Sequence, residues 1–245
     1  MKEIIMDIHA HIIPGVDDGS TSMEETMRMI GQAHDEGICA IIATPHYGIV
    51  NCGYDSKNAV NIYHQLVERV KIDYPDMTII MGNEIYYTQG IVEDLIDGKA
   101  RCLGNTSYAL VEFNIWSEFE AIKSAIDEFT LNGFRPIIAH LERYECLKNN
   151  IELVEELISR GAYVQINCRS ITGSGNEIEK RTSWSLELLE RGLVHFIASD
   201  CHNDNKRRPI YRDAVKCMIE YVGVSETKRI VKSNIISLIK NEKIS

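Results

Sequence analysis

Apolar residues gather in seven short runs along the chain, each about as long as a β-strand. Several of these runs are almost continuously hydrophobic, which is typical of parallel strands covered on both faces. The runs are Ile4–Ile8, Ile38–Thr44, Met77–Gly82, Ala109–Phe113, Pro136–Ala139, Tyr163–Ile166 and Val194–Ala198. This pattern predicts seven buried parallel strands.

Amphipathic segments with helix boundary signals lie between the strand runs. Serine, threonine or asparagine at a helix start and glycine just past its end are strong boundary signals. Three helices have both signals. Their start and stop residues are Thr21 (with Glu24) and Gly37 for the first, Ser117 (with Glu120) and Gly133 for the second, and Asn150 and Gly161 for the third. Weaker patterns predict helices over Lys57–Lys71 and Trp184–Arg191, and a C-terminal helical region with Ser225 as a cap.

The alternation of strand and helix predicts an α/β fold, with either an open doubly wound sheet or a closed barrel. No glycine-rich phosphate loop follows the first strand run, which weakens the nucleotide-binding form of the open sheet. Periodicity alone does not decide whether the sheet closes. The 245 residues contain no repeat, low-complexity tract or linker, so we expect one domain over residues 1–245.

Composition excludes several classes of protein. The chain has 26 basic and 36 acidic residues, a formal net charge of −10, and an acidic surface repels the phosphate backbone of nucleic acids. No apolar run approaches the ~18 residues of a membrane span. Seven scattered cysteines without a C-x-x-C motif favour neither a disulfide framework nor a zinc knuckle. We therefore expect a cytoplasmic protein without a nucleic-acid partner or membrane span.

Histidines and carboxylates follow the strand runs, where the carboxyl ends of parallel strands share one crevice. Five of the eight histidines lie there, and His9 and His11 form an H-x-H pair whose side chains share one face of a strand. Imidazole with carboxylate and without thiolate suits Mn, Fe or Zn. These residues exceed the needs of one ion, so the sequence predicts two or three metals, with Glu84 suited to bridge them.

These strand-end motifs resemble those of the bacterial PHP-class protein-tyrosine phosphatases of capsule and exopolysaccharide operons, within the polymerase and histidinol phosphatase superfamily. The first motif, Asp7–Gly19, reads DIHAHIIPGVDDG. Similar motifs cover the rest of the chain at Ala43–His46, Gly82–Tyr87, Tyr108–Phe113, Ile138–Tyr144 and Ile197–Asn203. Their shared order is far more specific than any single motif.

The resemblance implies a distorted TIM-like (β/α)7 barrel that holds three divalent ions, usually manganese. Matched position by position, the implied metal ligands are His9, His11, Asp18, His46, Glu84, Glu112, His140, Asp200 and His202. Arg143 and Arg208 would hold the phosphate. The segment from His202 to Pro209 is one residue longer than the usual pattern, so Arg207 competes with Arg208 for this role.

The implied function is hydrolysis of phosphotyrosine by a metal-bridging hydroxide, on the tyrosine-rich tail of a bacterial tyrosine autokinase that controls polysaccharide synthesis. Three alternatives stay open: a histidinol-phosphate or other small-molecule phosphatase, a phosphodiester-cleaving enzyme, and a non-catalytic metal-stabilised regulatory module. Cys201 and Arg207 also match the Cys-x5-Arg signature of thiolate phosphatases. The loop between them lacks glycine and contains Asp204, which would repel phosphate, so we expect this match to be coincidental.

Overall fold

The computed structural model describes residues 5–49, 56–173 and 176–244. Ile4, the first residue of the first predicted strand run, lies outside the described residues. The strands are β1 Met6–Ala10, β2 Ala40–Ala43, β3 His46–Tyr47, β4 Thr78–Met81, β5 Glu84–Tyr86, β6 Tyr108–Glu112, β7 Arg135–Ile138, β8 Tyr163–Asn167 and β9 Phe196–Ala198. Each predicted run therefore overlaps a strand of the structure.

Two of the predicted runs lead into a second strand after a two-residue break. Thr44 and Pro45 separate β2 from β3, and Gly82 and Asn83 separate β4 from β5. Proline has no N–H to donate to a neighbouring strand, so a break at Pro45 is expected. The breaks divide the strands into a sheet of order β1-β2-β4 and a sheet of order β3-β5-β6-β7-β8-β9, in which every pair is parallel.

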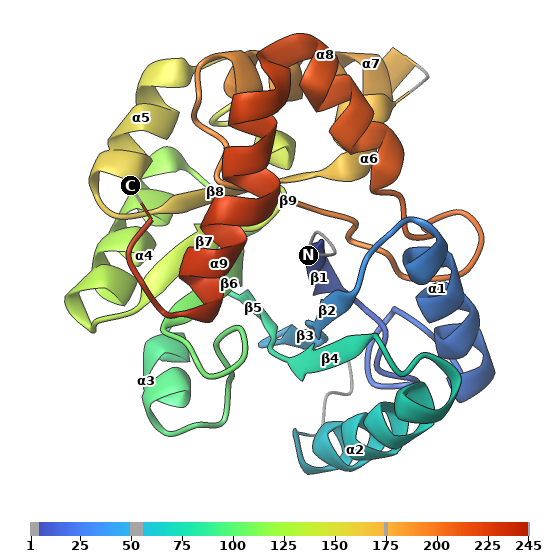
Figure 1. Ribbon diagram of the computed structural model, residues 1–245. Coiled ribbons are helices and arrows are strands. Elements are labelled where there is room, and N and C mark those ends of the chain that lie inside the picture. The colour runs from blue at the N-terminus through green and yellow to red at the C-terminus, as the bar shows by residue number, and fades with distance from the viewer. Residues whose placement is uncertain (1–4, 50–55, 174–175, 245) are drawn as a thin grey trace.

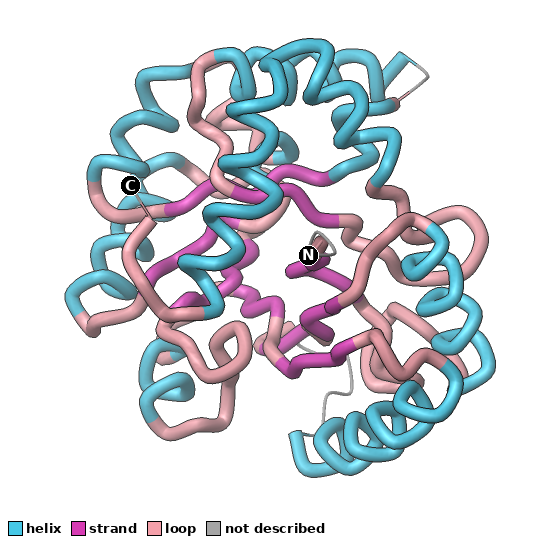
Figure 2. Tube along the Cα trace, viewed as in Figure 1, coloured by secondary structure: helices cyan, strands magenta, loops and turns pink. Residues whose placement is uncertain are grey.

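The two sheets curl round to form a distorted (β/α)7 barrel (Figures 1 and 2). The ring closes between β1 and the segment after β9, where Ala10 and Cys201 form a parallel bridge. Here the His11 N–H donates to the Cys201 carbonyl at 2.9 Å, and the Asp200 N–H donates to the His9 carbonyl at 3.0 Å. The prediction of an α/β barrel is confirmed, and these contacts supply the closure that periodicity left open.

Alternate residues of the strands face the barrel interior and the surrounding helices. In β6, Tyr108 and Leu110 belong to the interior cluster, whereas Ala109 and Val111 pack with the larger outer cluster. Ile235 and Leu238 of α9 (Asn234–Ile239) join the interior cluster and cover the amino ends of the strands. The carboxyl ends of the strands lie at the opposite end of the barrel. There Glu112 continues the inward-facing series of β6 residues that begins with Tyr108 and Leu110.

The other helices surround the barrel (Figure 1). They are α1 Met23–Asp35, α2 Ser56–Asp73, α3 Ile91–Ile96, α4 Phe119–Leu131, α5 Ile151–Ser159, α6 Cys168–Thr172, α7 Asn176–Glu190 and α8 Arg212–Lys228, and α9 follows a π-helical turn at Arg229–Ser233. A 3-10 turn spans Leu141–Arg143. None of the helices in the described ranges is long and apolar enough to cross a membrane.

Three of the four predicted N-cap residues need correction. The N-cap of α1 is Ser22 and not Thr21, because the Ser22 side chain accepts from the Glu25 N–H. The N-cap of α4 is Glu118 rather than Ser117, and Ser225 lies within α8, two residues after a break at Gly223. Asn150 is confirmed, since its side chain caps α5 through the Leu153 N–H.

Candidate metal centre

The structure brings all nine predicted ligands to the carboxyl ends of the strands. Among the residues that the structure describes, three groups have ligand atoms within 4.8 Å of one another: His11, Asp18, His46 and His202; His9, His11 and Glu84; and His46, Glu84 and Glu112. His140 is connected to these groups through Glu84, because His140 Nε2 lies 2.9 Å from Glu84 Oε1. Asp200 lies beside the H-x-H pair, with Oδ1 3.6 Å from His9 Nε2.

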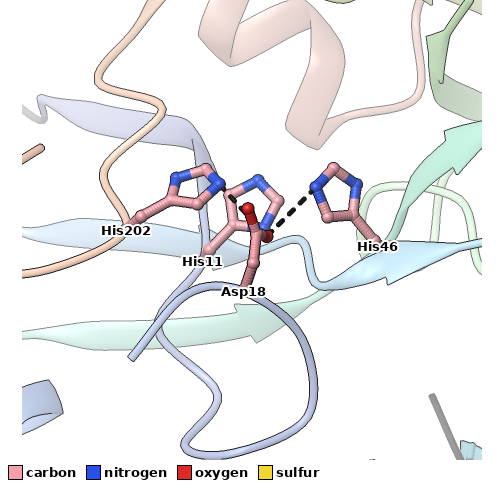
Figure 3. Close-up of side chains that lie close together, drawn as sticks. All are labelled: His11, Asp18, His46 and His202. Atoms are coloured by element: carbon pink, nitrogen blue, oxygen red, sulfur yellow. Dashed lines mark ion pairs between the residues drawn. The ribbon is translucent and has the colours of Figure 1, made fainter. Parts of the chain in front are cut away.

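The first group gathers residues from three distant segments (Figure 3). Asp18 Oδ1 lies 3.3 Å from His46 Nε2 and 3.4 Å from His202 Nε2. The His11 ring stacks against the His202 ring at a centroid distance of 3.9 Å. Hydrogen bonds to His202 and His46 hold the pKa of Asp18 well below its usual range. Asp18 is therefore a carboxylate at neutral pH, the form that binds cations.

Glu84 lies at the centre of the cluster and is almost completely buried. Its Oε2 is 3.2 Å from His9 Nε2, 3.1 Å from His11 Nε2 and 3.1 Å from His46 Nδ1, while Oε1 contacts His140. Burial opposes ionisation, but the contacts with His9, His11 and His140 hold the pKa of Glu84 well below its usual range. A buried carboxylate that faces imidazoles on both oxygens is well placed to bridge cations.

The closely spaced nitrogen and oxygen atoms of the cluster fit metal ions. His46 Nδ1 and Glu112 Oε2 are buried, make no hydrogen bond and lie 3.6 Å apart. His9 Nε2 and His11 Nε2 lie 3.2 Å apart, and both of these nitrogens point at Glu84 Oε2. Ligands bound at ~2.1 Å to one cation lie at similar separations from each other. The donors are imidazole and carboxylate without thiolate, a set that suits Mn, Fe or Zn.

A second layer of polar residues, which sequence reasoning missed, orients these ligands. Asp17 Oδ2 accepts from His11 Nδ1 at 2.7 Å, and Gln165 Oε1 lies 3.1 Å from His9 Nδ1. Gln165 Nε2 then donates to Asn167, and Asn167 Nδ2 donates to Asp200 Oδ2 at 2.8 Å. Such contacts fix the tautomer and direction of a ligand. Asp17 could have been found from its position beside the predicted ligand Asp18. Gln165 lies within an apolar strand run, which gives no such signal.

Two of the predicted ligands have strained backbones. His140 has a φ of 33° and Asp200 a φ of 50°, in the left-handed region that residues other than glycine rarely adopt. Both residues follow the end of a strand, and both side chains reach the cluster. Strain of this kind persists only where the surrounding structure imposes it, and it is frequent at functional sites.

Two arginines border the cluster on the side of Asp200. Arg143 donates to Asp200 Oδ2 at 2.7 Å, and Arg207 Nη2 lies 3.0 Å from both Asp200 oxygens. Together with the metal-ligand candidates they line a cavity of about 140 Å³. Arg208 is exposed and does not line this cavity, whereas its competitor Arg207 does, so the geometry favours Arg207 for the predicted contact with phosphate.

A family model for capsular polysaccharide synthesis, CpsB/CapC, matches residues 5–240 of the chain. The chain belongs to the CpsB/CapC family. Tyrosine-protein phosphatase CpsB of Streptococcus agalactiae is 32% identical to it over 98% of this chain and 100% of the relative. Tyrosine-protein phosphatase YwqE of Bacillus subtilis is also 32% identical, over 98% of this chain and 93% of the relative. This membership confirms the resemblance drawn from the strand-end motifs.

A solved structure of a CpsB/CapC protein has the same fold. It comes from work on YwqE from Bacillus subtilis and CpsB from Streptococcus pneumoniae, described as metal-dependent tyrosine phosphatases, and superimposes with a TM-score of 0.90. The two chains are 30% identical, with 98% of this chain and 96% of the other covered. A histidinol phosphate phosphatase from Lactococcus lactis has a TM-score of 0.61 at 14% identity over 89% of this chain and 94% of the other, so it shares the fold alone.

Cys201 of this CpsB/CapC chain is not placed to act as a thiolate nucleophile. Its side chain is buried, and burial together with the nearby Asp7 and Asp200 carboxylates raises the pKa of the thiol well above its usual range. A thiolate phosphatase needs a lowered thiol pKa and an accessible sulfur. The geometry therefore agrees with the expectation that the Cys-x5-Arg match is coincidental.

Proposed function

We propose that this protein is a metal-dependent tyrosine phosphatase that removes phosphate from phosphotyrosine in a protein substrate. One observation carries the proposal: imidazoles and carboxylates from distant segments converge on Glu84, and Arg143 and Arg207 border the same cavity. Similarity to named tyrosine-protein phosphatases over nearly the whole chain supports the substrate class.

The proposed cofactors are three divalent cations, with manganese as the first choice. Three groups of candidate ligands support this number, and the nitrogen and oxygen donors suit manganese, iron or zinc. When bound, such cations supply an activated water and stabilise negative charge on the phosphoryl oxygens. With three cations and one hydroxide, the four carboxylates and two arginines leave the site with a net formal charge of about +3, which favours a phosphate dianion.

The chain's own residues bind and orient the phosphate in this proposal. Arg143 and Arg207 approach Asp200 from the edge of the cavity, and their guanidinium groups can bind phosphate oxygens as planar forks. These contacts balance the charge that spreads over the phosphoryl oxygens during the reaction. Phenolate is a fair leaving group, since the pKa of tyrosine is about 10, so no strong general acid is needed.

We further propose the tyrosine-rich tail of a bacterial tyrosine autokinase as the protein substrate, in the control of capsule or exopolysaccharide synthesis. The family description, capsular polysaccharide synthesis, supports this setting. An extended phosphorylated tail can present a single tyrosine to a cavity of about 140 Å³ while the rest of the peptide stays on the surface.

The test combines metal analysis of purified protein with phosphatase assays. We expect hydrolysis of a phosphotyrosyl peptide that chelator abolishes and Mn²⁺ restores, and little hydrolysis of histidinol phosphate. Glu84→Gln removes one charge from the centre of the cluster and should abolish activity, while Glu93→Gln makes the same change at an exposed position on α3 and should not. Activity that survives chelator but not thiol alkylation, or a preference for histidinol phosphate, would overturn the proposal.

A further inference from the structure

A second cavity adjoins the phosphate-binding side of the metal cluster. Its volume is about 220 Å³, and it shares Arg143, Asp200 and Arg207 with the cavity that holds the metal-ligand candidates. Its remaining wall is formed by Asn167 at the end of β8, by Arg169 and Ser170 of α6, and by Ser199 after β9. We call this second cavity the flanking pocket. A phosphotyrosine bound at the cluster would have this pocket as its immediate neighbour.

The flanking pocket carries more positive than negative charge. Three guanidinium groups line it, against the single carboxylate of Asp200. That carboxylate already accepts hydrogen bonds from Arg143, Arg207 and Asn167. The buried Glu142 accepts from the Ser170 hydroxyl at 2.6 Å, and it does not line the pocket. The pocket therefore has unbalanced positive charge on its wall.

Arg169 is the source of this imbalance. It is half-buried, and within the described part of the chain it makes no hydrogen bond or ion pair. Burial and the nearby Arg208 and Arg207 lower the pKa of Arg169, while Asp200 opposes this shift. A partly buried cation is stabilised when it gains an anionic partner, and an arginine binds carboxylate or phosphate through two parallel hydrogen bonds.

We propose that the flanking pocket binds a second anionic group of the peptide substrate, a carboxylate or phosphate close to the phosphotyrosine in sequence, and that Arg169 determines this specificity. This proposal rests on the proposed function, because it places the second anion beside a phosphotyrosine at the metal cluster. Arg143 and Arg207 face both cavities but serve the reacting phosphate and Asp200. Arg169 lines the flanking pocket and not the cavity of the metal-ligand candidates, so it is placed to recognise the neighbouring group.

The experiment compares matched peptides that differ only beside one phosphotyrosine. One arm places glutamate or glutamine at each neighbouring position, and the other places phosphoserine or serine there, so that the two anion sources are separated. Release of phosphate from tyrosine is followed by chromatography of the peptides with the Mn²⁺-loaded protein. We expect kcat/KM to be about three- to ten-fold higher for the anionic peptides, the range for a partly buried ion pair.

Arg169→Gln should reduce this ratio of anionic to neutral peptide to about one, and Arg169→Lys should retain part of it because the charge remains but the planar fork is lost. Arg208→Gln is the matched control, since it removes the same charge from an exposed neighbour outside the pocket. Thermal unfolding of each variant checks that it folds. High salt should weaken the preference in the wild type.

Three results would overturn the proposal. The wild type could cleave anionic and neutral peptides equally. Arg169→Gln could slow all the peptides alike, which would assign Arg169 to the reacting phosphate instead. Arg208→Gln could lower the ratio as much as Arg169→Gln, which would indicate a general surface field. If the metal-loaded wild type cleaved none of the peptides, the proposed function would fail and this inference with it.

Discussion

Replacing Asp17 by asparagine removes the charge that orients a predicted metal ligand while it leaves the shape of the side chain almost unchanged. Asp17 Oδ2 accepts from His11 Nδ1 at 2.7 Å and from the His46 N–H at 3.0 Å, and Oδ1 accepts from the Gly19 N–H at 3.0 Å. An asparagine has one acceptor oxygen, so its NH₂ group must face at least one of these donors. If His11 responds by moving its proton to Nε2, that nitrogen can no longer bind a cation.

The expected magnitude follows from two independent estimates. Loss of a contact that orients a metal ligand typically weakens metal binding by about 10- to 100-fold, or roughly 1.4–2.7 kcal/mol. The bond from His11 to Asp17 is a short hydrogen bond to a charged group, which typically contributes about 1.5–3 kcal/mol. These ranges overlap. We therefore expect Asp17→Asn to raise the Mn²⁺ concentration for half-maximal activity by about 10- to 100-fold.

The assay titrates metal-free protein with Mn²⁺ and follows hydrolysis of a phosphotyrosyl peptide. Asp17→Asn should recover most of its turnover at saturating Mn²⁺, because the proposed ligands are all present. Asp18→Asn, which changes a proposed ligand directly, should not recover in this way. Asp213→Asn makes the same change at an exposed position of α8 and serves as the control. If Asp17→Asn needs no more Mn²⁺ than the wild type, Asp17 does not orient His11 for metal binding.

Three further predictions test other parts of the structure. Arg143→Gln should lower kcat/KM about 100- to 1000-fold with unchanged metal content by elemental analysis, and loss of metal would contradict its assignment to the phosphate. Cys201→Ser should keep its phosphatase activity and its sensitivity to chelator, whereas an inactive but folded variant would restore the thiolate mechanism. Burial and Arg229 lower the pKa of His195 from 6.5 to about 4, and its Nδ1 accepts from the Val164 N–H. His195 should therefore contribute a fall of up to about 3 kcal/mol to the free energy of unfolding of the metal-free wild type as pH drops from 6.5 to 4. His195→Gln should lose this contribution in urea titrations, and a pH dependence equal to that of the wild type would refute the assignment.

The strands of the barrel could be predicted because both of their faces are buried, which leaves short continuous apolar runs in the sequence. The closure of the barrel could not be predicted, because it depends on hydrogen bonds between the end of β1 and a segment about 190 residues later. One of these hydrogen bonds joins the His11 N–H to the Cys201 carbonyl. The predicted start of α1 is wrong because Thr21 and Ser22 are both good caps by type. The predicted start of α4 is wrong because this helix begins after Glu118 without a side-chain cap hydrogen bond, which residue type does not indicate.

The convergence of the candidate ligands could be predicted because most of them lie at or beyond the end of an apolar run, and the carboxyl ends of parallel strands meet. The choice between Arg207 and Arg208 depends instead on the path of a loop. Asn203 Oδ1 accepts from the Arg207 N–H at 2.9 Å, and the His202 N–H donates to the Arg207 carbonyl at 2.9 Å. This turn directs Arg207 toward Asp200, and no property of the residue types distinguishes the two arginines.

The distribution of charge explains how an acidic protein can accept an anionic substrate. The chain has a formal net charge of −10, yet Arg143, Arg169 and Arg207 gather around two adjoining cavities. At physiological salt, exposed charges are screened beyond about 8 Å, so a phosphate inside a cavity responds mainly to these nearby groups. A long polyanion would also meet the acidic surface outside. The arrangement therefore favours a short segment that carries one or two phosphates or carboxylates, which is the substrate chemistry that both proposals require.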